Sequence, residues 1–128
     1  MATQAARDVM LPGVSLHIKD RGSTLVKKLL GKYHALPVVN DDHEVVGIVS
    51  EQNILDALEE KKTIFECSAT ALMRCGHAKH VRCATPVAVS PDTPLHDVIK
   101  TIFREQLSTL PVVENRKLVG IIHRKNIL

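Results

Sequence analysis

Two stretches of the chain place apolar residues at helical spacing, one in each half. In the second half they recur at i, i+3, i+4, i+7 and i+8, the pattern of a helix with one buried face: Leu95, Val98, Ile99, Ile102 and Phe103. Thr93 is expected to cap this helix, and Pro94 is expected in its first turn. In the first half, Ser23 is the expected cap, and the apolar face is less regular: Leu25, Val26, Leu29, Leu30 and Tyr33.

Short apolar runs without helical spacing flank each predicted helix. Residues 14–18 and 87–89 precede the two helices, and residues 35–49 follow the first one as two runs separated by a polar turn. Runs of this length that are rich in β-branched residues predict strands covered on both faces, and the turn between them predicts a hairpin. A second helix is expected to begin at Ser50 in the first half and at His123 in the second.

The chain contains an internal repeat. Residues 36–39 recur as 110–113, both reading Leu-Pro-Val-Val, and residues 46–55 recur as 119–128. One half of this size is too small to bury an adequate core by itself. We therefore predict an α+β fold in which two β-α-β-β-α repeats pack together with pseudo-twofold symmetry. The expected boundaries are 1–62 for the first repeat, 63–80 for a linker and 81–128 for the second repeat.

Composition narrows the classes of function. The chain has 128 residues, of which 45% are hydrophobic, and a formal net charge of +3 that is scattered rather than clustered. With one Tyr, two Phe and no Trp it has little with which to stack nucleic-acid bases, so nucleic-acid binding is not expected. No apolar run approaches the roughly 18 residues that cross a bilayer, and the N-terminus lacks the apolar core of a signal peptide. We expect a cytoplasmic protein without a membrane partner.

No catalytic motif is recognisable in the sequence. It contains no Gly-x-Ser-x-Gly nucleophile motif, no glycine-rich phosphate loop and no His-Glu-x-x-His metal motif. Because nucleophile and metal chemistry usually leave such spacings, a function other than catalysis is expected.

A run of metal-ligand residue types lies between the two repeats. It comprises Cys67, Cys75, His77, His80 and Cys83. Thiolates and imidazoles bind zinc or copper, but the spacing lacks the Cys-x-x-Cys of a zinc knuckle. Cys67 and Cys75 would also share one buried face of a helix. We expect no metal site, and a metal or redox sensor built on this run is the alternative.

Three elements in each half resemble the motifs of cystathionine-β-synthase (CBS) domains, and the whole chain resembles the tandem pair called a Bateman module. They are an entry at 8–12 and 84–86, the two Leu-Pro-Val-Val strands, and glycine-led segments at 47–53 and 120–126. The resemblance implies a non-catalytic sensor that binds an adenosine-containing ligand, such as AMP, ADP, ATP or S-adenosylmethionine, in clefts between the repeats. It also implies no required cofactor, a homodimer, and an effector protein that the sequence does not identify.

Polar side chains of the third element are the expected ligand contacts. Ser50 stands where a helix begins, so its hydroxyl and the free backbone N–H groups suit a phosphate. Asn53 faces the same side one turn later and suits a ribose, with Gly47 letting the ligand approach. Many nucleotide-binding family members carry Asp where Asn53 stands, so we expect roughly tenfold weaker ribose binding. Both side chains also suit a helix cap, which leaves open a structural dimerisation module with vestigial clefts.

In the second half, His123 takes the place of Ser50. A protonated imidazole beside Arg124 and Lys125 would attract a polyphosphate and respond to pH near 6.5, and Asn126 is the expected ribose contact. The entry and strand residues are expected to form apolar slots for the base: Leu11, Pro12, Leu36, Pro37 and Val38 in one half, and Thr85, Pro86, Leu110, Pro111 and Val112 in the other.

Overall fold

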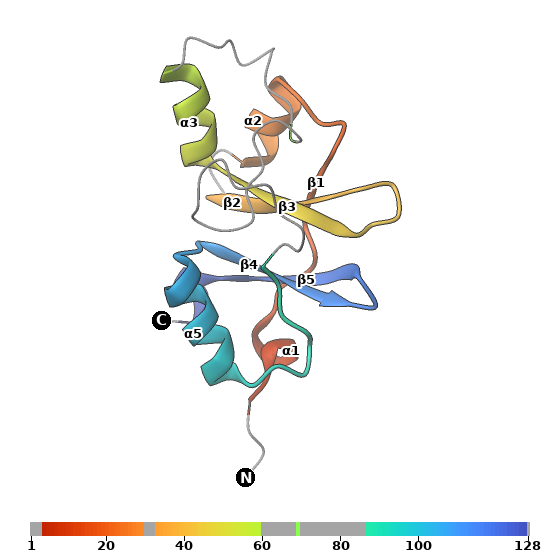
Figure 1. The fold of residues 1–128 in the computed structure, drawn as a ribbon, viewed down its shortest axis with the longest axis vertical. Helices are drawn as coiled ribbons and strands as arrows, with labels where there is room; N and C mark the ends of the chain where they lie inside the picture. Colours follow the sequence, from red (N-terminus) through yellow and green to blue (C-terminus); the bar gives the residue numbers. More distant parts are fainter. Residues whose placement is uncertain (1–3, 30–32, 60–68, 70–86, 128) are drawn as a thin grey trace.

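A computed structural model describes residues 4–29, 33–59, 69 and 87–127 of the chain, and the structural statements below concern these residues. Short helices and strands alternate in both halves (Figure 1). In chain order the elements are α1 (Ala6–Val9), β1 (Leu16–His17), α2 (Ser23–Leu29), β2 (Ala35–Val39), β3 (Val45–Ser50), α3 (Glu51–Glu59), α5 (Leu95–Glu105), β4 (Thr109–Glu114), β5 (Lys117–His123) and the 3-10 helix η2 (Arg124–Asn126). None of the helices in this part of the chain is long and apolar enough to cross a membrane.

Each half contains an antiparallel hairpin with the same register. β2 pairs with β3 so that Ala35 lies opposite Ser50, and β4 pairs with β5 so that Thr109 lies opposite His123. Both hairpins have an irregularity between the two valines of the Leu-Pro-Val-Val motif. β1 runs parallel to β2 at the edge of the first hairpin. The predicted hairpins and their repetition are confirmed.

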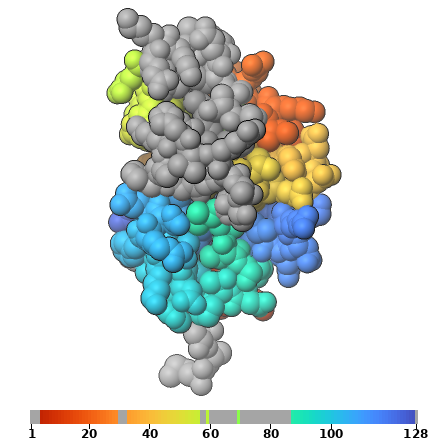
Figure 2. All heavy atoms as spheres, in the orientation of Figure 1, coloured from red at the N-terminus to blue at the C-terminus, as the bar shows by residue number. Residues whose placement is uncertain are grey.

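The hydrophobic core consists of two clusters, and each draws residues from both halves. The first is built on β1, α2 and the first hairpin but includes Leu118 and Ile121 of β5. The second is built on α5 and the second hairpin but includes Ala35 and Ile48. The yellow and blue hairpins also touch in the space-filling view (Figure 2). Since each cluster needs residues of the other half, the prediction of two α+β repeats packed together with pseudo-twofold symmetry is confirmed.

The N-terminal segment packs against the second half. α1 contacts β5, and Leu11 and Ile121 exchange two backbone hydrogen bonds of 2.8 and 3.1 Å. A Cβ atom at Gly120 would lie 2.7 Å from the sulfur of Met10 and 3.0 Å from the Leu11 carbonyl oxygen. Gly120 therefore permits the close approach of this segment to β5, since a larger residue would collide with it.

Two helix starts differ from the sequence expectation. α5 begins at Leu95 with Pro94 as its N-cap residue, and no side chain caps it. The Thr93 hydroxyl instead accepts a hydrogen bond of 3.0 Å from the Ser90 N–H, so the expected cap is engaged in the preceding turn. In the second half, β5 extends to His123, and a single 3-10 turn follows where an α-helix was expected.

Candidate functional site

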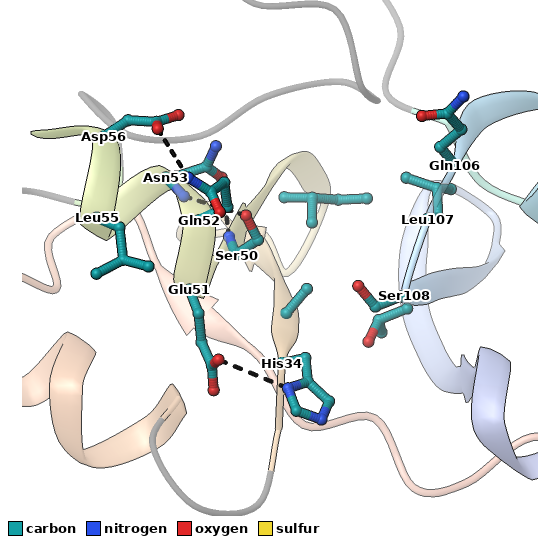
Figure 3. A pocket seen from close by; sticks show the side chains of 13 residues that line it. His34, Ser50, Glu51, Gln52, Asn53, Leu55, Asp56, Gln106, Leu107 and Ser108 are labelled. Atoms are coloured by element: carbon teal, nitrogen blue, oxygen red, sulfur yellow. Dashed lines mark hydrogen bonds and ion pairs between the residues drawn. The ribbon is translucent and has the colours of Figure 1, made fainter.

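A cleft of about 420 Å³ lies between the two halves, beside the start of α3 (Figure 3). One wall comes from the first half, where β2 begins and where β3 leads into α3. The facing wall is the segment that leads from α5 into β4. The lining residues are His34, Ala35, Ile48, Ser50, Glu51, Gln52, Asn53, Leu55 and Asp56 from the first half, and Gln106, Leu107, Ser108 and Thr109 from the second. A ligand held here would contact both repeats.

Ser50 and Asn53 form a reciprocal pair at the start of α3. The Ser50 N–H donates to Asn53 Oδ1 at 2.8 Å, and the Asn53 N–H donates to Ser50 Oγ at 3.2 Å. This capping box satisfies backbone donors that a helix start leaves unpaired. It leaves the Ser50 hydroxyl hydrogen and the Asn53 amide NH₂ as donors toward a ligand.

The backbone donors at the start of α3 are largely used within the protein. The Glu51 N–H donates to the His34 carbonyl oxygen at 2.9 Å, and the Asn53 N–H is taken by the Ser50 hydroxyl. Two of the first three N–H groups of the helix are therefore paired, whereas an anion site at a helix start depends on such groups being free. Of the donors expected for a phosphate, the Glu51 and Asn53 N–H groups are therefore taken, whereas the Ser50 hydroxyl still has its hydrogen to donate.

The part of the cleft lining that the structure describes is acidic. It contains the carboxylates of Glu51 and Asp56 and, among the described residues, no Lys or Arg. The His34 Nδ1 lies 3.6 Å from Glu51 Oε2, and Gln52 Nε2 donates to Asp56 Oδ1 at 2.9 Å. The apolar part of the lining comprises Ile48, Leu55 and Leu107. The cleft thus combines a small apolar surface with negative charge.

Of the predicted contacts, Ser50 and Asn53 line this cleft, whereas the described residues of the predicted apolar slots do not. The strand residues of those slots are buried: Leu36, Pro37, Val38, Leu110, Pro111 and Val112. Because the strands are covered on both faces, their side chains enter the core instead of the cleft. Leu11 and Pro12 are exposed, and the Leu11 backbone itself pairs with Ile121 of β5.

Several predicted residues lie outside the part of the chain that the structure describes. Thr85 and Pro86 are among them, as is the Cys/His run of Cys67, Cys75, His77, His80 and Cys83. Within the described ranges, no three His, Cys, Asp or Glu side chains are grouped so that they could hold a metal ion.

Sequence reasoning missed the wall that the second half contributes, residues 106–109. These residues come directly before the second Leu-Pro-Val-Val motif, as His34 and Ala35 come directly before the first. The hairpin register places Ala35 opposite Ser50, so the residue before the motif lies next to the glycine-led segment. The position of residues 106–109 directly before the motif was therefore the available indication that they lie near a glycine-led segment. Only the fold shows that they face the segment of the first half.

The repeat symmetry places a second seam, meaning the position equivalent to the cleft, beside the end of β5. There, side chains from the two halves meet. There His123 stands in place of Ser50, and Tyr33 stands in place of Leu107. The ring centroids of His123 and Tyr33 are 5.4 Å apart, and His123 Nδ1 lies 3.0 Å from the Thr109 hydroxyl oxygen. Two rings therefore meet where, in the first seam, Ser50 and Leu107 line an open cleft.

His123 is buried, with 7% of its surface exposed, and its Nε2 has no hydrogen-bond partner within the described structure. Burial lowers the pKa of His123 below the usual 6.5, and the electrostatic influence of the neighbouring Lys125 and His34 acts in the same direction. The ring is therefore neutral at pH 7, which corrects the expectation of a protonated imidazole that attracts a polyphosphate. The other contacts expected in this half are exposed on η2: Arg124, Lys125 and Asn126.

The fold and the cleft define a class of protein, a two-repeat α+β module with a ligand-sized opening between its repeats. A family model for the CBS domain matches residues 6–60 and 78–128. The chain belongs to the CBS domain family and is a tandem CBS pair, as the sequence resemblance indicated.

Solved structures share this fold over nearly the whole chain. Hypoxic Response Protein I with two coordinated zinc ions superimposes with a TM-score of 0.80 at 19% identity, covering 97% of this chain and 96% of that one. The CBS domain pair of MJ0100 in complex with 5′-methylthioadenosine and S-adenosyl-L-methionine gives 0.77 at 24% identity, with coverages of 97% and 96%. CBSX2 in complex with AMP gives 0.74 at 24% identity, with coverages of 97% and 92%.

The curated relatives are longer proteins. The chain is 29% identical over 86 residues to MJ1225 of Methanocaldococcus jannaschii, covering 67% of this chain and 27% of that protein. It is 31% identical over 90 residues to YlbB of Bacillus subtilis, with coverages of 69% and 54%. It is 30% identical over 93 residues to a homoserine O-acetyltransferase of Methanococcoides burtonii, with coverages of 72% and 16%. The chain thus spans between 16% and 54% of these relatives.

Proposed function

We propose that this chain is a non-catalytic regulatory module that binds an adenosine-containing ligand in the cleft between its repeats. The observation that carries the proposal is that the cleft lies at the glycine-led segment of the first repeat and is closed by residues 106–109 of the second. The structural neighbours in complex with AMP, or with 5′-methylthioadenosine and S-adenosyl-L-methionine, support the ligand class.

The lining offers separate surfaces for the base and for the ribose of such a ligand. Leu107 faces α3 from across the cleft (Figure 3), and together with Ile48 it offers an apolar surface for the base. The Ser50 hydroxyl and the Asn53 amide donate toward ribose oxygens. Because the ligand touches both repeats, it favours one relative angle between them. The regulatory output is a population shift that an effector protein or another domain detects.

Calorimetric titration of the chain with adenosine and its derivatives tests the proposal. Ser108 lines the cleft and is exposed, so Ser108→Trp fills the opening without disturbing the core. We expect this variant to bind at least about tenfold more weakly, a loss of about 1.4 kcal/mol. Thr24→Trp, at an exposed position of α2 outside the cleft, is the matched control and should bind like the parent chain. Equal binding by both variants would place the ligand elsewhere.

We further infer that two copies of the chain associate through the side that carries α3 and α5. Leu55 on α3 is 52% exposed and Phe103 on α5 is 50% exposed, although both are large apolar side chains. In Figure 1, α3 lies above the hairpins and α5 lies below them, and both are at the left edge of the view. Such exposed apolar residues are typical of an interface. Sedimentation velocity should show a dimer that the double variant Leu55→Ser, Phe103→Ser dissociates, and an unchanged mass would refute this interface.

The bridged second seam favours the rival function of a structural dimerisation module with vestigial clefts. That rival predicts a stable dimer whose melting temperature does not respond to any adenosine derivative. A bound ligand at 100 times its dissociation constant stabilises a fold by about 2.7 kcal/mol, which a thermal melt resolves easily. A dimer without any such shift would therefore establish the rival function in place of ours.

A further inference from the structure

We propose that the cleft selects adenosine derivatives without phosphate groups, whose 5′ substituent is neutral or positively charged. The inference rests on the proposed function, because it concerns the same cleft, and it specifies the chemical class of the ligand. It differs from the phosphate contact that the sequence suggested at Ser50. Two independent features carry it, the state of the donors at the helix start and the charge of the lining.

The first feature is the lack of an anion-binding arrangement at the start of α3. A phosphate at a helix N-terminus is held by several backbone N–H groups that point at it. Here the Glu51 N–H is bound to the His34 carbonyl oxygen at 2.9 Å, and the Asn53 N–H is bound to Ser50 Oγ at 3.2 Å. A phosphate would have to break the capping box to gain these donors. A neutral ligand uses the Ser50 hydroxyl and the Asn53 amide without breaking it.

The second feature is the carboxylate of Glu51 at the helix start. Its side chain is 38% exposed, so it faces partly solvated space and not an apolar core. The nearest base in the lining is His34, whose Nδ1 lies 3.6 Å from Glu51 Oε2, and the described lining residues include no Lys or Arg. A phosphate in this cleft therefore meets a negative charge that no Lys or Arg of the described lining offsets. An amine or sulfonium meets an attractive one.

Arg124 and Lys125, the two cations expected to contact a ligand in the second repeat, do not line this cleft. Arg124 lies on η2, and its guanidinium carbon is 5.2 Å from the centroid of the Phe103 ring, so it is held on α5. Lys125 follows on the same turn, at the seam that His123 and Tyr33 bridge. Neither residue lines the cleft.

Titration calorimetry of the full chain with five probes tests the selection: adenosine, 5′-methylthioadenosine, S-adenosylmethionine, AMP and ATP. We expect AMP and ATP to bind at least about tenfold more weakly than adenosine. S-adenosylmethionine should bind at least as tightly as 5′-methylthioadenosine. Raising the salt concentration should narrow the difference between adenosine and AMP, because screening weakens repulsion between solvated charges.

Substitution of Glu51 separates its charge from the shape of the cleft. Glu51→Gln should bring AMP to within about threefold of adenosine, and Glu51→Lys should make AMP the tighter ligand. Glu114→Gln is the matched control, because Glu114 is an exposed carboxylate at the end of β4 outside the cleft. This control should show the same ratio of adenosine affinity to AMP affinity as the parent chain.

The outcomes distinguish this inference from the proposed function. The selection is refuted, while nucleoside binding stands, if AMP or ATP binds more tightly than adenosine. It is also refuted if the ratio of adenosine affinity to AMP affinity is the same in Glu51→Lys as in the parent chain. If none of the five probes binds, the selection and the proposed function are both refuted.

Discussion

The rings of His123 and Tyr33 meet at a centroid distance of 5.4 Å, whereas their repeat equivalents, Ser50 and Leu107, line an open cleft. The two seams of a repeat protein are thus chemically different although the backbone registers match. A serine and a leucine are too small to span the gap that a histidine and a tyrosine close. This difference has consequences for how many ligands a chain can hold.

We expect one adenosine-type ligand per chain. The double variant His123→Ser, Tyr33→Leu, which copies the open seam, should raise the number toward two, because it removes both rings. His96→Ser, at an exposed position of α5, serves as the control and should keep a stoichiometry of one. The number of sites is read from titration calorimetry. Two ligands bound to the parent chain would show that the rings do not close the second seam.

Stability should fall with acid because of His123. Its pKa in the folded chain lies below the usual 6.5, so the unfolded chain takes up the proton first. The stabilising contribution of the neutral ring is fully present above about pH 6.5 and is lost as the pH falls through the folded-state pKa. The urea midpoint, measured from about pH 7.5 to about pH 5, should decline less in His123→Gln than in the parent chain. An identical decline in both would contradict the assignment, and His96→Gln should behave like the parent.

The Ser50 and Asn53 pair should respond differently to two substitutions. Ser50→Ala removes the acceptor for the Asn53 N–H and should cost about 1 kcal/mol of stability in urea unfolding. Asn53→Asp keeps an oxygen for the Ser50 N–H and adds a charge at the positive end of α3, so stability should rise by about 0.5 kcal/mol. Because a carboxylate accepts from both ribose hydroxyls, adenosine affinity should rise roughly tenfold in Asn53→Asp. Unchanged affinity would mean that Asn53 does not contact the ribose.

The close approach of the N-terminal segment to β5 should make Gly120→Ala destabilising. The added Cβ would lie 2.7 Å from the Met10 sulfur and 3.0 Å from the Leu11 carbonyl oxygen, and relieving that overlap should cost about 1–3 kcal/mol. Gly13→Ala is the comparison, because its nearest neighbour would be the Leu118 Cγ at 3.3 Å. Gly13→Ala should lose less free energy of unfolding, measured by chemical denaturation. Equal losses in the two variants would show that the N-terminal segment shifts at little cost to make room for the added Cβ.

Local patterns predicted the parts of the fold that depend on near neighbours. Each Leu-Pro-Val-Val run lies in the first strand of a hairpin, as predicted. Val98 and Ile102 of the predicted helical face are buried. The expectation for Thr93 failed because its hydroxyl had a competing partner in the Ser90 N–H, which no periodicity reveals. For Ser50 and Asn53 the sequence left a ligand contact and a helix cap open, and the structure shows that the two residues do cap α3.

The amino-acid sequence alone determined that there are two repeats, where the two hairpins and the main helix of each repeat lie, and that each repeat needs the other, because hydrophobic periodicity and core size are properties of the chain itself. Tertiary structure decided where the ligand-sized space lies. Residues 106–109 reach the cleft only when the second repeat is packed against the first. It also decided the charge state of His123, since a pKa depends on burial and on neighbours such as His34, which is far away along the chain.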